Sequence, residues 1–295
     1  MYYRDGLGQA EIAKRLGVHH STISRALRQA LEEGIVDVRI TEPLPEGAAI
    51  ESRLLHALPL RGATVSASQR KEALTGVAAS ASDAISRLLV RGETVAVGWG
   101  MTMVAVARAC RGRAASGAAV AEAVGHVLWE GSSAGEASRL LATSTGADYF
   151  PMSAPGYASP EMAEELLRSD TLASCLKTAR ESSGIFVSTG TVSDDSPFVG
   201  TALKDVNEMR QMRQKGAVGE ILGHYIDVDG SPVSCPYFTP IGLTLNDLSA
   251  AESVYGVVCG PHKAQVTVAA IRGGYIHHLV TDVATAESLL ALALT

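Results

Sequence analysis

The sequence predicts an α/β protein in two parts: a small, winged-helix-like helix-turn-helix module at the N-terminus, and a large α/β domain with a mostly parallel sheet. Two short helical patterns meet at a glycine within the first 30 residues, and strand-like and helix-like segments alternate from residue 51 onward. We expect the first module to cover residues 1–40, a linker residues 41–50, and the large domain residues 51–295.

Length and composition favour a cytoplasmic protein. A chain of 295 residues, 46% apolar and 19% charged, can bury a full core. Its longest apolar runs, such as Val254–Cys259, fall far short of the ~20 residues that cross a bilayer. No basic and apolar leader opens the chain, and the four cysteines show neither zinc-type spacing nor a disulfide framework. We therefore expect no membrane partner, no metal and no cofactor.

The distribution of charge separates the two parts. Residues 1–30 hold five basic side chains against two acidic ones, a net of +3, whereas the whole chain carries −6 and the remainder therefore −9. A polyanion such as DNA is attracted to the first part and repelled by the second. The patch is modest, so oligomerisation would help by multiplying the phosphate contacts.

The first 30 residues follow the pattern of a helix-turn-helix. Ile12 and Leu16 lie four apart and can face a core, and Gly17 can take the left-handed conformation that ends a helix. The inward stripe expected in the second helix consists of Ile23, Ala26, Leu27, Ala30 and Leu31. Residues 1–7 have the pattern of the tail of a helix that begins upstream, or of an unusually short first helix.

The opposite face of the second helix carries hydroxyl and guanidinium groups. Because residues near the start of a recognition helix reach base edges, Ser21, Thr22 and Arg25 are the main candidates for reading DNA, with His20 as a further one. Arg28 is better placed for a phosphate. The alternative is an amphipathic hairpin whose charged side is merely solvated. After this helix, apolar residues alternate from Ile35 to Ile40, which predicts a short strand or wing.

In the large domain, short apolar runs separated by helical patterns indicate parallel strands covered on both faces. The expected strands are Ala63–Ser66, Thr94–Gly98, Ala147–Phe150, Ile185–Ser188, Val254–Cys259 and Ile276–Thr281. The expected helices are Ala48–Ala57, Lys71–Leu89, Met103–Cys110, Gly135–Thr145, Pro160–Leu167, Leu172–Ser182, Pro261–Ile271 and Ala284–Leu292. Such sheets bind ligands beyond the carboxyl ends of their strands, so each glycine-rich strand exit is a candidate site.

Three strand exits combine glycine with hydroxyl or cationic side chains. The stretch Gly98–Thr102 precedes an apolar helix and favours a phosphate cradle, with a tight turn made for packing as the alternative. Gly190 and Thr191 follow a second strand, and Lys263 a third. Glu220 lies among glycines and could accept hydrogen bonds from sugar hydroxyls. For both Lys263 and Glu220 the alternative is a solvated surface charge.

Several motifs, in order and over essentially the full length, resemble those of the SorC family of sugar-binding transcriptional regulators. The matching stretches are Tyr2–Leu7, Glu33–Val36, Val97–Gly100, Lys215–Gly223, Gly260–Ala264, Gly273–Ile276 and Leu279–Asp282. The resemblance implies an effector domain related in fold to phosphosugar isomerases, assembly into homodimers or homotetramers, and a response to phosphorylated sugars or polyols.

Carried over by matching position, the resemblance implies one effector pocket. Its candidate residues are Gly98, Trp99, Gly100, Met101, Thr102, Gly190, Thr191, Glu220 and Lys263. Glu220 stands where the family commonly has aspartate, one methylene shorter. The turn at Thr189-Gly190 lacks the usual first glycine.

These observations together predict a transcriptional regulator whose partners are double-stranded operator DNA and a phosphorylated sugar. The alternative is a sugar-phosphate isomerase-like enzyme that uses the same pocket. Against an enzyme, the chain has no G-x-S-x-G elbow, no H-E-x-x-H pair and no clean Cys/His constellation, so we expect no catalytic residues.

Overall fold

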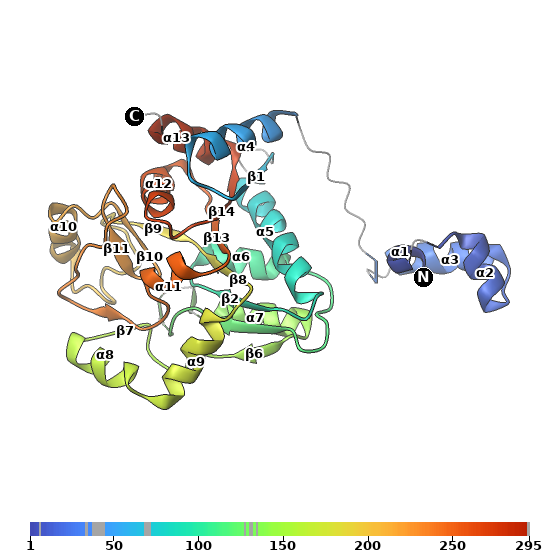
Figure 1. Ribbon diagram of the computed structural model, residues 1–295, viewed down its shortest axis with the longest axis horizontal. Helices are drawn as coiled ribbons and strands as arrows, with labels where there is room; N and C mark the ends of the chain where they lie inside the picture. Colours follow the sequence, from blue (N-terminus) through green and yellow to red (C-terminus); the bar gives the residue numbers. More distant parts are fainter. Residues whose placement is uncertain are drawn as a thin grey trace. The chain divides into compact units, whose positions relative to one another are not determined.

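The computed structural model describes residues 1–5, 7–32, 35–36, 45–67, 72–126, 128–129, 132–133 and 135–293. The chain divides into two compact units, Met1–Pro43 and Leu44–Thr295 (Figure 1). Helix α4 (Pro45–Ala57) begins inside the stretch 41–50 that the sequence marks as a linker. Residues 45–50 are therefore helical, because a proline fits the first turn of a helix, where its missing N–H group is not needed.

The described residues of the first unit form three helices, α1 (Tyr2–Asp5), α2 (Gln9–Leu16) and α3 (His20–Glu32). Gly17 ends α2 in the expected left-handed conformation, with φ of 64°. Ile12, Ala13 and Ile23 form the small buried core between α2 and α3. The inward position expected for Leu16 is wrong: its side chain is 53% exposed, because it is the last residue of α2 and lies beyond this core.

Two further expectations for this unit are corrected or fall outside the described residues. Ala26 is exposed, so the inward stripe of α3 is narrower than expected. Of the strand expected at 35–40, only Ile35 and Val36 are described. They lie in a bend, in which the Val36 N–H group donates to the Ala30 carbonyl at 2.9 Å. The remainder of the expected wing, residues 37–40, lies outside the described residues.

A seven-stranded parallel sheet forms the centre of the second unit, in the order β1-β14-β13-β8-β2-β3-β6. Six of its strands match predicted ones: β1 (Gly62–Ser66), β2 (Thr94–Val97), β6 (Asp148–Phe150), β8 (Gly184–Val187), β13 (Val254–Val257) and β14 (His278–Asp282). The sequence pattern does not predict the seventh, β3 (Ala119–Glu122), because alanine and glutamate are poor strand formers.

Helices cover both faces of this sheet, as the alternating pattern predicts (Figure 1). Val95 and Val97 of β2 contribute to one hydrophobic core, and Ala96 between them contributes to the other. The first core takes in α5 (Ala73–Leu89), α6 (Met101–Ala109) and α7 (Glu136–Thr145). The second takes in α4, α9 (Asp170–Arg180), α12 (Ala264–Arg272) and α13 (Val283–Ala293), and a 3₁₀ turn, η2 (Pro261–Lys263), precedes α12.

Smaller elements cluster beyond the carboxyl ends of the central strands. An antiparallel sheet consists of β9 (Thr189–Thr191), β10 (Gly219–Ile221) and β11 (His224–Ile226). Two short pairs join β7 (Tyr157–Ala158) to β12 (Thr239–Pro240), and β4 (Leu128–Trp129) to β5 (Ser132–Ser133). The remaining helices are α8 (Pro160–Leu167), which matches its prediction, and α10 (Val206–Gln214) and α11 (Leu245–Ala250), which the sequence pattern does not predict.

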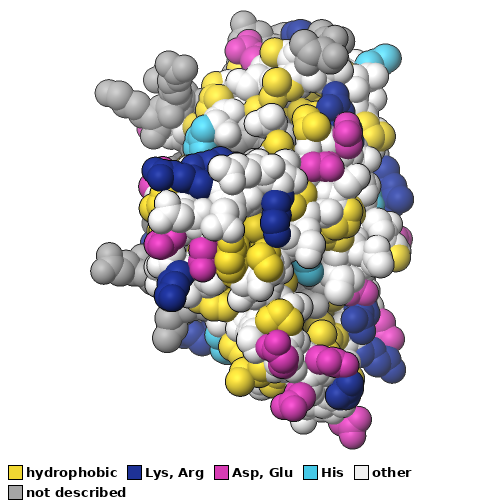
Figure 2. Space-filling model, turned by 90° about the vertical axis from the view of Figure 1, so that its left-hand side faces the viewer, with side chains coloured by type: hydrophobic (Ala, Val, Ile, Leu, Met, Phe, Trp, Pro, Cys, Tyr) yellow, Lys and Arg dark blue, Asp and Glu magenta, His cyan; other side chains and the backbone are white. Residues whose placement is uncertain are grey.

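Side chains of both charges alternate over the face shown in Figure 2, without a broad patch of one sign. Within the described part of the chain, no helix combines the length and the apolar character that a membrane span requires.

Candidate functional site

A cavity of about 620 Å³ borders the edge of the sheet where β2, β8 and β13 end. Parallel strands place their carboxyl ends at one edge, and this volume is typical of small-molecule sites. The segments after these three strands contribute to the wall, together with β10 and the loop after β9. The lining residues are Trp99, Gly100, Met101, Thr102, Ser188, Thr189, Gly190, Thr191, Ser193, Asp195, Ser196, Pro197, Phe198, Glu220, His262 and Lys263.

The cavity brings together eight of the nine residues expected in one pocket. They are Trp99, Gly100, Met101, Thr102, Gly190, Thr191, Glu220 and Lys263. The ninth, Gly98, is not among the lining residues. Its N–H group donates to the Phe186 carbonyl at 2.8 Å, and a Cβ atom there would lie 2.8 Å from Cδ2 of Leu222. The glycine at 98 therefore allows the chain after β2 to pack closely against Phe186 and Leu222. At this residue the structure supports the alternative, a tight turn made for packing.

One end of the cavity is the start of helix α6. Gly100 precedes the helix with φ of 111°, a conformation that side chains other than hydrogen rarely permit, and no side chain caps the helix. The first N–H groups of a helix have no acceptor inside it, and together with the helix dipole they favour an anion. Thr102, in this first turn and 7% exposed, adds a hydroxyl group.

Glu220 is a buried carboxylate in the middle of β10. In the sheet, Glu220 pairs with Gly190 on β9 and with Tyr225 on β11. The side chain is only 5% exposed, and Oε2 accepts a hydrogen bond from the Gly223 N–H group at 2.7 Å. Burial raises the pKa of this carboxyl to about 7, against the opposing effects of the Gly223 N–H group and the Lys263 charge. Glu220 can therefore act as an acceptor for hydroxyl groups and can change its protonation near neutral pH.

Lys263, the last residue of η2, supplies a positive charge to the same cavity. Burial lowers the pKa of its ammonium group, and the nearby Glu220 carboxylate opposes that shift. Both alternatives that placed Glu220 and Lys263 among solvated surface charges are wrong, because one side chain is buried and the other is partly buried in the cavity wall.

The loop from Ser193 to Phe198 is a part of the wall that sequence reasoning missed. Phe198 is 3% exposed and packs edge-on against Trp99, with ring centroids 5.5 Å apart. Asp195 is exposed, and a hydrogen bond from Ser193 lowers its pKa, with the charge of His262 acting in the same direction. This loop has neither a glycine nor a strand pattern of its own. The only signal in the sequence is its position soon after the Gly190-Thr191 turn.

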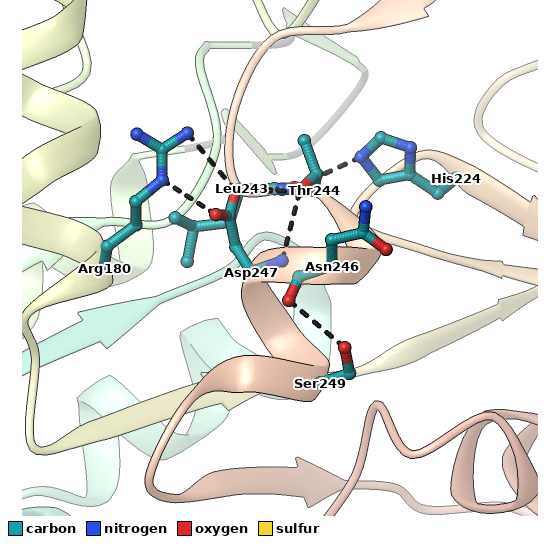
Figure 3. A network of polar contacts seen from close by, with 7 residues as sticks. All are labelled: Arg180, His224, Leu243, Thr244, Asn246, Asp247 and Ser249. Carbon is teal, nitrogen blue, oxygen red and sulfur yellow. Dashed lines mark hydrogen bonds and ion pairs between the residues drawn. The ribbon is translucent and has the colours of Figure 1, made fainter.

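A polar network joins β11 and α9 to the start of helix α11 (Figure 3). His224 follows Gly223 directly, and its Nε2 bonds to the Leu243 carbonyl at 3.1 Å. Burial lowers the pKa of this imidazole, so the neutral form is favoured. The adjoining Thr244 and Asp247 form a capping box at the start of α11, and Arg180 Nε donates to Asp247 Oδ1 at 2.8 Å. Across the described residues, no group of three or more His, Cys, Asp and Glu side chains could hold a metal ion.

In the first unit, helix α3 presents most of its DNA candidates to solvent. His20, Thr22, Arg25 and Arg28 are exposed. Ser21 is partly buried, and its Oγ lies 2.9 Å from Nδ1 of His19 and 3.5 Å from the Arg25 guanidinium. The Ser21 N–H group also donates to the same His19 nitrogen at 3.4 Å, so an imidazole occupies the capping position at the start of this helix.

Comparison with known proteins agrees with this arrangement. Residues 43–291 match the Sugar-bind family model, which describes a sugar-binding domain, and residues 1–30 match a helix-turn-helix domain model. The transcriptional regulator LsrR of Klebsiella pneumoniae is 28% identical over 99% of this chain and 91% of that protein. LsrR of Escherichia coli O139:H28 is 29% identical over 98% of this chain and 92% of that protein.

Solved structures share the fold. The sugar-binding domain of a transcriptional repressor from Vibrio fischeri superposes with a TM-score of 0.76 and 28% identity, over 84% of this chain and 100% of that one. The full-length sorbitol operon regulator SorC from Klebsiella pneumoniae gives a TM-score of 0.73 at 23% identity, over 98% of this chain and 96% of that one. The expected resemblance is confirmed: the chain belongs to the sugar-binding domain family of SorC-type transcriptional regulators, with a helix-turn-helix domain at its N-terminus.

Proposed function

We propose that a phosphorylated sugar or polyol binds in the cavity and controls the affinity of the helix-turn-helix module for operator DNA. One observation carries the proposal: a single cavity contains an uncapped helix start at Gly100–Thr102, the cation of Lys263 and the buried acceptor Glu220. An anionic group and several hydroxyl groups on one small molecule would satisfy all three.

The parts of the cavity suit different parts of such a molecule. The N–H groups at the start of α6 and the Thr102 hydroxyl suit a phosphate. Lys263 adds positive charge that favours an anionic ligand. Glu220 can accept hydrogen bonds from sugar hydroxyls through the lone pairs that the Gly223 N–H group leaves free. Of the nine candidate effector residues, the proposal keeps the eight that line the cavity and leaves out Gly98.

The DNA-binding role is assigned to the exposed side of α3. Thr22 and Arg25 lie in its first turns and would reach base edges, with His20 and Ser21 beside them, while Arg28 would contact a phosphate. With a net charge of only +3 in residues 1–30, one module would bind weakly. A homodimer or homotetramer working in the cytoplasm would bring several modules to one operator.

The effector can control DNA binding only if its affinity for the protein differs between the DNA-bound and the DNA-free state. A typical coupling of about 1–3 kcal/mol changes DNA affinity roughly 5- to 150-fold. The test is fluorescence anisotropy with DNA from upstream of the gene, titrated with D-fructose 6-phosphate, D-ribose 5-phosphate or D-sorbitol 6-phosphate. K263M should lose the response and K177M, which removes an exposed lysine of α9, should keep it. A phosphosugar that binds the protein without changing its DNA affinity would contradict the proposal.

The isomerase-like alternative rests on one feature, a carboxyl with a pKa of about 7 beside a lysine, since such a carboxyl could transfer a proton at neutral pH. Proton NMR of the same phosphosugars incubated with the protein decides between the two. Turnover that E220Q abolishes would favour the enzyme, and binding without turnover the regulator.

A further inference from the structure

Ser188 is a buried residue of the cavity wall whose hydroxyl no described residue engages. It directly follows β8, the middle one of the three strands that end at the cavity. The residue is 8% exposed, and its Oγ has no hydrogen-bond partner among the described residues. Burying a hydroxyl without a hydrogen bond costs free energy, so such a group in a native structure calls for an explanation.

The hydroxyl groups that follow Ser188 in this wall, by contrast, have partners. Oγ1 of Thr189 lies 3.1 Å from Oγ1 of Thr267, and Oγ1 of Thr191 lies 3.0 Å from Oγ of Ser193. Oγ of Ser196 accepts a hydrogen bond from a backbone N–H group at 3.4 Å. The neighbouring hydroxyls are therefore occupied by the fold itself, whereas the one at position 188 remains available.

We propose that Ser188 is a specificity-determining residue, whose hydroxyl hydrogen-bonds an oxygen substituent on the middle of the effector's carbon chain. This inference rests on the proposed function. β8 lies between β2, whose exit leads to the helix start at Gly100, and β13, whose exit leads to Lys263. A group attached to the end of β8 therefore faces the part of the ligand between its phosphate and its far end.

The chemistry of serine fits this role. A hydroxyl can donate one hydrogen bond and accept others, so it suits either a hydroxyl or a carbonyl oxygen. It also turns among three staggered positions about the Cα–Cβ bond. The oxygen is buried and can thus turn toward a bound molecule while Cβ stays in the wall.

The experiment compares S188A with T281V in the full-length chain. Thr281 of β14 is a matched control: it is fully buried, its Oγ1 also has no partner among the described residues, and it is not a lining residue of the cavity. Calorimetric titration with D-ribose 5-phosphate, D-fructose 6-phosphate and D-sorbitol 6-phosphate gives the Kd, and thermal unfolding of the free protein gives the midpoint. S188A should weaken the best-bound probe roughly 5-fold, the loss of about one neutral hydrogen bond, without lowering the midpoint. T281V should leave the Kd unchanged, and it too should not lower the midpoint of thermal unfolding.

Each other outcome overturns the inference. Unchanged affinity of S188A for every probe that the wild type binds would show that the hydroxyl takes no part, while the proposed function would stand. An equal loss of affinity in T281V, or a lower midpoint that accounts for the loss in S188A, would show a general structural effect. If the wild type binds none of the three phosphosugars while it binds its DNA, the proposed function fails and this inference fails with it.

Discussion

The carboxylate of Glu220 lies against Gly190 so closely that a Cβ atom at position 190 would overlap its Oε1. The two residues are direct partners in the register of β9 and β10, and Oε2 is held by the Gly223 N–H group at 2.7 Å. The missing side chain at 190 thus provides the space that a buried glutamate needs at this point of the cavity.

We expect G190A to destabilise the protein by about 1–3 kcal/mol, since the overlap must be relieved by moving a buried carboxylate or the strand. Urea unfolding measures the loss. G47A is the control: in helix α4 a Cβ atom would meet only the Val65 carbonyl at 3.4 Å, and an alanine should stabilise the helix by about 0.5–1 kcal/mol. Shortening the carboxylate should compensate, so G190A/E220D should be more stable than G190A. A G190A protein as stable as the wild type would refute the contact.

The raised pKa of Glu220 predicts a specific dependence of stability on pH. Below pH 4.5 the carboxyl is protonated in both the folded and the unfolded state. Between pH 4.5 and about 7 only the unfolded chain releases the proton, so stability falls as the pH rises, and above 7 the loss levels off at about 3 kcal/mol. E220Q should lack this loss. Urea unfolding at pH 5, 6, 7 and 8 should show the advantage of E220Q growing with pH, and a constant difference would contradict the assignment.

The sequence predicts well which residues line the cavity at the ends of the strands, and poorly the loop that completes its wall. Glycine and hydroxyl residues directly after apolar runs mark strand exits, and this local chemistry identified Gly100, Thr102 and Gly190. The wall at Pro197 and Phe198 comes from an irregular loop that folds back over the cavity, and no short-range pattern encodes such a return. Strand β3 was not predicted either. Its alanines are held in the sheet by tertiary packing and not by an intrinsic preference for strands.

We predict different effects on DNA binding for substitutions of two arginines of helix α3. R28A should weaken binding to all sequences alike and reduce the slope of log K against log salt by about 1 per module, because Arg28 is proposed to contact a phosphate. R25A should cost about 1–3 kcal/mol of binding free energy on the operator and little on unrelated DNA, because Arg25 is proposed to contact a base. Anisotropy titrations at several salt concentrations separate the two. Equal losses on operator and unrelated DNA in R25A would argue against base recognition by this residue.

Asp247 holds the polar network at the start of α11, and D247N should destabilise the fold by about 1 kcal/mol through loss of the capping box and the Arg180 ion pair. Burial alone would raise the Asp247 pKa, but the hydrogen bonds from Arg180 and Thr244 outweigh it and keep the pKa below its usual value. The stabilisation is therefore present above pH 3.8 and disappears as the pH falls through the lower pKa of the folded state. Chemical unfolding of both proteins at pH 3 and pH 7 should show a larger difference at pH 7 than at pH 3.

The most direct measurement of the regulatory mechanism is the phosphosugar Kd determined twice, with the protein free and with the protein saturated by operator DNA. Linkage requires that the effector changes DNA affinity by the same factor by which DNA changes effector affinity. We predict a shift of at least 5-fold in both titrations, of equal size. Identical Kd values in the two states, with DNA and phosphosugar both bound, would contradict the coupling between the cavity and the DNA-binding helix.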